Sequence, residues 1–177
     1  MEGLTTKETL DKIIELYNIG FNFNAKCDRL SYVLSVSMNY PSLGNFVHKQ
    51  FAHRIVGDDF ADKIEGYGEL RHDLFYRDAL PVHAESFNSI SQLFEDLVLE
   101  VADIQNRCEE AIKIAANNGD FGYEDLLRDI NKGFITKLLK QVMVLQDASM
   151  KYDRDNKGYK FEKDFKIYLL DEFKEDL

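Results

Sequence analysis

Four side chains between residues 42 and 66 are the best candidates in this sequence for binding a metal ion. They are His48, Asp58, Asp62 and Glu65. Imidazole nitrogens and carboxylate oxygens are donors that iron and related transition metals accept. On a helix that advances by about 100° per residue, all four fall within roughly 60° of Asp62, and so do the apolar side chains of Phe51 and Ile55. The sequence therefore predicts one helix whose core-facing stripe changes from apolar to acidic along its length.

An acidic stripe that faces a core needs a cationic partner, because burying an unpaired carboxylate is costly. A hard metal ion is one candidate, and an Arg or Lys from a neighbouring helix is another. Alternatively, this end of the helix leaves the core and the acids are solvated. His48 and Asp62 would lie about 21 Å apart on a single helix, so the two could share an ion only across a symmetric, antiparallel dimer.

A second motif that could bind metal is the Glu-x-x-His pattern formed by Glu69 and His72. This spacing places both side chains on one helical face, as dinuclear carboxylate sites require. The pattern occurs once, whereas a bundle site needs two copies. His53 and His83 have no partner at a ligand-like spacing, so we interpret them as ordinary surface or core histidines.

Residues 153–164 resemble an EF-hand calcium loop. Asp153, Asp155 and Asp164 would be ligands, and Gly158 would occupy the turn. Lysines stand where an oxygen ligand and an apolar residue belong, and Asp164 replaces the long bidentate Glu. A polar turn between two helices is therefore the preferred interpretation, and a calcium-responsive binding module is the alternative.

Apolar side chains recur every three or four residues along most of the chain, which indicates long amphipathic helices. One such seam runs through residues 84–118 and another through residues 121–150, separated by a turn at Gly119. A similar pair occupies the N-terminal half, where Gly20 is a point at which the first helix could kink or divide. We also expect a short helix over 69–83 and a last helix near 162–174.

These elements predict an all-α fold. Two antiparallel helical hairpins, joined by a long crossover that carries the short helix, would form a four-helix bundle over residues 1–150. Residues 151–177 would form an acidic, aromatic C-terminal tail with a short helix.

Composition restricts the class of partner. The 177 residues include 32 acids and 22 bases, a net charge of −10, which disfavours nucleic acids and anionic membranes. No stretch approaches the ~20 apolar residues needed to span a bilayer, and the start of the chain lacks the apolar region of a signal peptide. Cys27 and Cys108 are far apart in the sequence and are interpreted as reduced core residues. We therefore expect a cytoplasmic protein without a membrane partner.

The stretch 46–51, which contains His48, followed by the acids at 58–62 resembles the ferritin-like superfamily. The likeness is closest to Dps-type mini-ferritins and to the divergent Dps-like proteins of phage genomes, and the turn at 115–120 also looks like that family's last interhelical loop. The resemblance implies that His48 matches the family's histidine and that Asp58 and Asp62 match its acidic pair, with Asp in place of Glu. It also implies iron held between two subunits related by a two-fold axis.

Several departures from the family pattern argue against ferroxidase activity. The family's first helix supplies a His-Trp pair, but this chain has no Trp and reads Leu-Ser-Val-Ser-Met-Asn over 34–39; Ala52 stands where an acid is expected. We therefore expect a self-associating structural or interaction protein, a homodimer or a larger shell, with at most weak metal binding. An iron-storage or detoxification protein with an inter-subunit site is the alternative.

Overall fold

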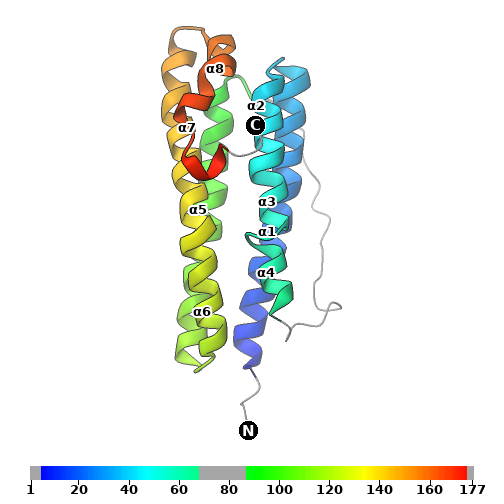
Figure 1. Cartoon of the computed structure of the whole chain (residues 1–177), viewed down its shortest axis with the longest axis vertical. Coiled ribbons are helices and arrows are strands. Elements are labelled where there is room, and N and C mark those ends of the chain that lie inside the picture. Colours follow the sequence, from blue (N-terminus) through cyan, green and yellow to red (C-terminus); the bar gives the residue numbers. More distant parts are fainter. Residues whose placement is uncertain (1–4, 68–86, 175–177) are drawn as a thin grey trace.

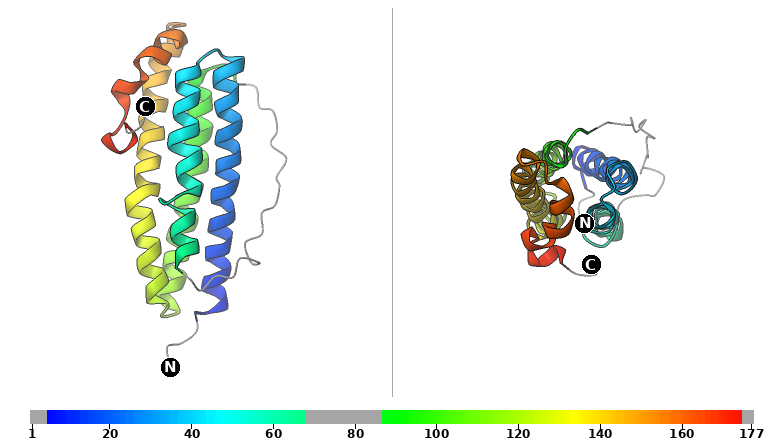
Figure 2. Two further views of the ribbon diagram at one scale, coloured as in Figure 1. Left: turned by 45° about the vertical axis from the view of Figure 1, so that its right-hand side comes forward. Right: turned by 90° about the horizontal axis from the view of Figure 1, so that it is seen from above.

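All regular structure in the described part of the chain, residues 5–67 and 87–174, is helical. The computed structural model shows long helical rods lying side by side, with the C-terminal tail against their upper half (Figures 1 and 2). The short helix expected over 69–83 lies outside the described residues, as do Glu69, His72 and His83. Within the described ranges, none of the helices is both long and apolar enough to span a membrane.

The rods are built from α-helices interrupted by short π-helical segments. The first rod is α1 (Lys7–Tyr32) with the π-helical η1 (Val33–Ser37). The second comprises α2 (Pro41–Phe46), the π-helical η2 (Val47–Ala52), α3 (His53–Val56) and α4 (Ala61–Gly66). Then follow α5 (Ile90–Asn117) and a rod made of α6 (Phe121–Ile130), the π-helical η4 (Asn131–Ile135) and α7 (Thr136–Arg154). The tail contains α8 (Gly158–Asp164) and the 3₁₀ turns η5 (Phe165–Tyr168) and η6 (Asp171–Phe173).

The long helix expected within 84–118 is confirmed as α5, but it begins at Ile90 and leaves residues 87–89 outside the helix. Its predicted apolar seam is buried from Ile90 to Ala111 and packs against α1 and α7. The left-handed backbone of Gly119, with φ of 73°, ends the helix and turns the chain back into α6. Asp120 does not cap α6; its carboxylate instead accepts hydrogen bonds from the hydroxyls of Thr6 and Thr9 at the start of α1.

The first helix is not divided at Gly20, because α1 runs through this residue without a break. Gly20 has a packing role instead. A Cβ atom at this position would lie 2.6 Å from Cε1 of Phe60, so the absence of a side chain lets the Phe60 ring rest directly on α1.

The single helix expected over 42–66 is also wrong, and two features interrupt it. The π-helical η2 widens one turn, so residues beyond it no longer follow the 100° rotation of an α-helix. The backbone then leaves the helical region at Gly57, with φ of −103° and ψ of −152°, before α4 begins at Ala61. As a result Phe60, Ala61 and Ile64 face the core, whereas Asp58 and Asp62 are exposed.

The C-terminal tail packs into the same core as the rods. Phe161, Phe165 and Phe173 are fully buried, and their rings contact aromatic side chains such as Phe46 and Phe51 of the second rod. The tail helix therefore differs from the expected 162–174: it begins earlier, at Gly158, and gives way to 3₁₀ turns from Phe165 onward.

A buried glutamine and a carboxylate hold the tail in register. Gln141 of α7 donates to the carbonyl of Tyr168 and accepts from the amide of Leu170. The Glu162 carboxylate accepts from the amides of Ser42 and Leu43, the first free N–H groups of α2. The tail thus provides hydrogen-bond acceptors for backbone N–H groups at the start of the second rod.

Candidate functional site

The four residues predicted to bind metal have three different sets of neighbours, although the negative charge of Glu65 also contributes to raising the pKa of Asp62. Asp58 and Asp62 form the first environment. Both are exposed, and their carboxyl groups are close enough to interact. Partial loss of solvation raises the pKa of Asp62, and the hydrogen bond and negative charge of Asp58 raise it further.

Glu65 forms the second environment, on α4. Its carboxylate accepts a hydrogen bond from the hydroxyl of Tyr17, a buried residue of α1. Glu65 therefore serves as the hydrogen-bond acceptor for the Tyr17 hydroxyl and links α4 to α1.

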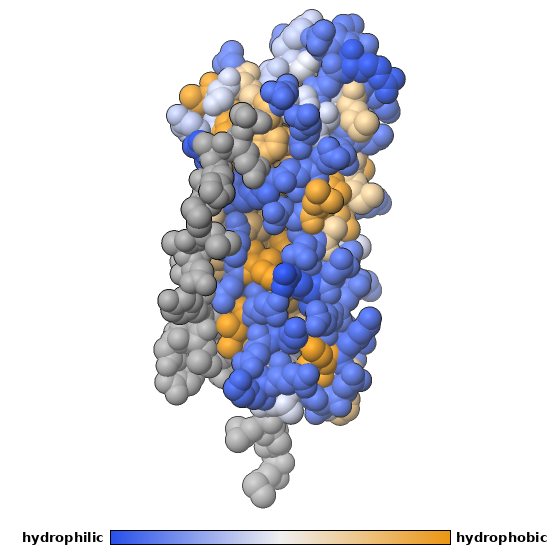
Figure 3. All heavy atoms as spheres, turned by 180° about the vertical axis from the view of Figure 1, so that it is seen from behind, coloured by the Kyte–Doolittle hydropathy of each residue, from blue (hydrophilic) through white to orange (hydrophobic). Residues whose placement is uncertain are grey.

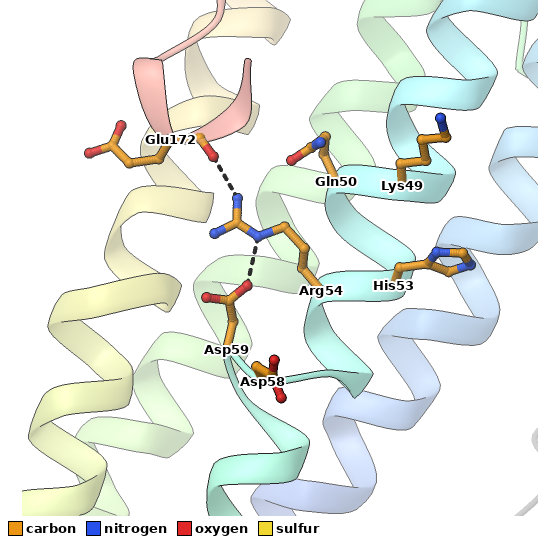
Figure 4. A pocket seen from close by; sticks show the side chains of 7 residues that line it. All are labelled: Lys49, Gln50, His53, Arg54, Asp58, Asp59 and Glu172. Atoms are coloured by element: carbon orange, nitrogen blue, oxygen red, sulfur yellow. Dashed lines mark hydrogen bonds and ion pairs between the residues drawn. The ribbon is translucent and has the colours of Figure 1, made fainter. Parts of the chain in front are cut away.

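His48 forms the third environment, together with two residues that sequence analysis did not group with it. Its Nδ1 lies 2.7 Å from Oδ1 of Asp28 on α1, in an ion pair or hydrogen bond that is about half exposed. Its ring also meets the ring of His53 edge-on, with centroids 4.1 Å apart. Figure 4 shows His53 pointing away from Arg54, on the side of the rod that faces α1.

The π-helical turn explains why this histidine pair was missed. In an α-helix, residues five apart point about 140° away from each other. Here the N–H of His53 donates to the carbonyl of His48, the i to i+5 bond that defines a π-helix, so the two side chains lie on one face. The Asn24 side chain of α1 supports the end of the turn by donating to the carbonyl of Ala52 at 2.7 Å. No periodicity in the sequence signals this turn.

A polar hollow of about 740 Å³ lies along the same rod, between it and the tail. It is lined by Lys49, Gln50, His53, Arg54, Asp58, Asp59 and Glu172 (Figure 4). The Arg54 guanidinium spans it, with Nε donating to Asp59 at 2.7 Å and Nη1 donating to the carbonyl of Glu172 at 2.8 Å. Two rings also lie against the guanidinium, since its carbon is 5.2 Å from the centroid of Phe134 and 4.7 Å from that of Phe173. These contacts fix the tail to the second rod.

Residues 153–164, which resemble a calcium loop, do not adopt an EF-hand conformation. Gly158–Asp164, the second half of the motif, is helical. Asp153 accepts from the amide of Ser91 at 2.8 Å and so caps α5, while Asp164 accepts from the hydroxyl of Tyr152 at 3.0 Å. The segment is a turn between two helices, and its acids have structural partners.

Iron of the kind implied by the resemblance does not fit the described part of one chain. Over residues 5–67 and 87–174, no group of three or more His, Cys, Asp or Glu side chains is arranged to hold a metal ion. His48, the Asp58–Asp62 pair and Glu65 each have a different neighbour. A shared site would need residues from a second copy or from outside the described ranges.

Comparisons with known proteins do not assign the chain to a family. No protein-family model matches it, and no curated protein matches it either.

Proposed function

We propose that this chain is a ferritin-like four-helix bundle that acts as a structural or interaction protein, binding protein surfaces that include a second copy of itself. The observation that supports this function most is an apolar interior combined with polar, chemistry-bearing side chains on the outside. Iron oxidation is not part of this function.

The interior supports the proposal because it is filled by hydrocarbon and aromatic side chains. Dinuclear carboxylate proteins place Glu and His ligands on the core-facing sides of their helices. In this chain the corresponding middle stretches of the rods contribute fully buried apolar groups. Examples are Cys27, Phe51, Ile55, Val101, Ile104 and Leu138.

The outer surface offers apolar side chains for association. Met143 and Met150 lie seven residues apart and so share one face of α7, where they are 52% and 48% exposed. Leu99, on the adjacent α5, is 66% exposed. The face in Figure 3 is largely hydrophilic, with apolar side chains in separated patches. A second copy that covers the α5–α7 surface would remove these three side chains from water.

Two buried thiols support a cytoplasmic location. Cys27 and Cys108 are free and buried, and burial raises the pKa of Cys108 to about 12. Neutral, buried thiols of this kind are typical of reduced core residues.

Sedimentation velocity of matched variants tests the association surface. We expect the unmodified chain to sediment as an assembly at micromolar concentration, and the L99E/M143E variant to sediment as the 20.6 kDa monomer. The I167E variant is the control, because Ile167 is 74% exposed but lies on the tail. Equal association by all three proteins would remove the α5–α7 surface from the proposal.

Iron binding between two copies is the second candidate function. It is favoured by the exposed Asp58–Asp62 pair, whose two neighbouring carboxylates would attract a cation from solvent. This function predicts that the protein speeds the aerobic oxidation of Fe(II) beyond a protein-free blank and that Asp62→Ala abolishes the effect. The leading proposal predicts rates equal to the blank for both proteins.

A further inference from the structure

The contact between His48 and His53 brings two metal-binding nitrogen heterocycles together on the surface of one chain. Their centroids are 4.1 Å apart and their planes are inclined by 61°. A tetrahedral ion about 2.1 Å from one nitrogen of each ring would place the centroids roughly 5 Å apart. The centroids therefore lie about 1 Å closer than in a chelating pair, and rotation of the two side chains would widen this spacing and turn one nitrogen of each ring toward the ion.

The backbone limits how far these two rings can separate. The hydrogen bond from the His53 N–H to the His48 carbonyl closes the π-helical turn directly beneath them. Because this turn is packed against α1, the pair is held on a rigid helical element and not on a loop.

Asp28 orients the His48 ring through a hydrogen bond, as carboxylates commonly do for metal-binding histidines. Its Oδ1 lies 2.7 Å from Nδ1 of His48. When Nδ1 carries the proton donated to this carboxylate, Nε2 has the free lone pair that a metal requires. A carboxylate behind the ring also makes the opposite nitrogen a stronger donor.

We propose that His48 and His53 chelate one divalent transition-metal ion of intermediate softness, such as Zn²⁺, Ni²⁺ or Cu²⁺, with Asp28 as the positioning residue for His48. Imidazole suits these ions, whereas Mg²⁺ and Ca²⁺ prefer oxygen ligands. Water fills the remaining coordination positions, because both rings are accessible to solvent. This site uses one chain only, so it goes beyond the proposed function and does not depend on self-association.

Copper binding to variants with a defined set of histidines tests the site. The chain has four histidines, and the H72Q/H83Q variant keeps only the proposed pair. We expect this variant to bind one Cu²⁺ with an affinity on the order of micromolar, and its electron paramagnetic resonance spectrum to show coupling to two imidazole nitrogens. Adding His53→Gln should remove one nitrogen and weaken binding at least tenfold.

A second substitution distinguishes orientation from direct ligation. Asp28→Asn in the H72Q/H83Q background should weaken Cu²⁺ binding by about tenfold while both nitrogen couplings remain at saturating metal. Circular dichroism confirms that each variant is folded before the comparison. Equal affinity and an unchanged nitrogen pattern in the His53→Gln variant would overturn the proposal, and so would the absence of any two-nitrogen species in H72Q/H83Q.

Discussion

At the scale of single residues, Arg54 joins three parts of the chain through one guanidinium group. It bonds to Asp59 after the break in the second rod and to the Glu172 carbonyl in the tail, and it lies against the rings of Phe134 and Phe173. Charge-assisted hydrogen bonds and cation–π contacts are stronger where the side chain is partly shielded from water. Arg54 is therefore a specific point at which the tail is attached.

Replacing Arg54 by Met should lower the free energy of unfolding by roughly 1–3 kcal/mol, since it removes two hydrogen bonds and the cation–π contacts. Urea unfolding followed by circular dichroism measures the change. Arg128→Met is the matched control, because Arg128 is exposed and pairs only locally with Glu124, so a cost of at most about 0.5 kcal/mol is expected. Equal costs for the two variants would show that Arg54 does not attach the tail.

The Asp58–Asp62 pair predicts a pH effect with a defined sign. Because the pKa of Asp62 is raised in the folded protein, the stability associated with its protonated form is lost as pH rises through that pKa. Asp58→Asn removes the neighbouring negative charge, so we expect a lower pKa for Asp62 and no loss of stability near neutral pH. Carboxyl-carbon NMR titration measures this pKa. An unchanged titration of Asp62 in the variant would contradict the assigned pairing.

At the scale of elements, Gly20 determines how closely the second rod approaches α1. In most exposed helices, Gly→Ala is stabilising by up to about 1 kcal/mol. Here the added Cβ would lie 2.6 Å from Cε1 of Phe60, so we expect Gly20→Ala to destabilise the protein by roughly 1–3 kcal/mol. In a Phe60→Leu background the same change should cost less, which a double-mutant cycle of unfolding free energies measures. Additive effects of the two substitutions would exclude the contact.

The regular elements could be predicted from the sequence, and the irregular ones could not. The apolar period of α5 continues without interruption, so its helix and buried face follow directly from the spacing. The second rod contains a π-turn and a break at Gly57, and each shifts the helical phase by an amount that apolar spacing does not reveal. The prediction that Asp58 and Asp62 face the core assumed one unbroken α-helix, so the π-turn and the break at Gly57 made it wrong. The same π-turn brings His48 and His53 together, which an unbroken α-helix would not do.

At the scale of the whole molecule, the tail is part of the core and not a separate appendage to it. Phe165 is fully buried between the rods, in contact with Phe46 and Phe161. We expect Phe165→Ala to lower the free energy of unfolding by about 3–5 kcal/mol. Ile167→Ala, at a neighbouring exposed position, should change it by less than about 0.5 kcal/mol. Thermal and urea unfolding measure both variants, and a small effect of Phe165→Ala would mean that the tail is only loosely attached.

Over residues 5–67 and 87–174 most apolar side chains lie inside, whereas His53, Asp58 and Asp62 are exposed, which is why we interpret the chain as a protein that acts through its surface. The most direct test is the mass of the unmodified chain in solution, determined by sedimentation equilibrium from about 1 to about 100 μM. We predict a mass that rises with concentration to at least twice 20.6 kDa. A mass of 20.6 kDa at every concentration would contradict self-association as the basis of its function.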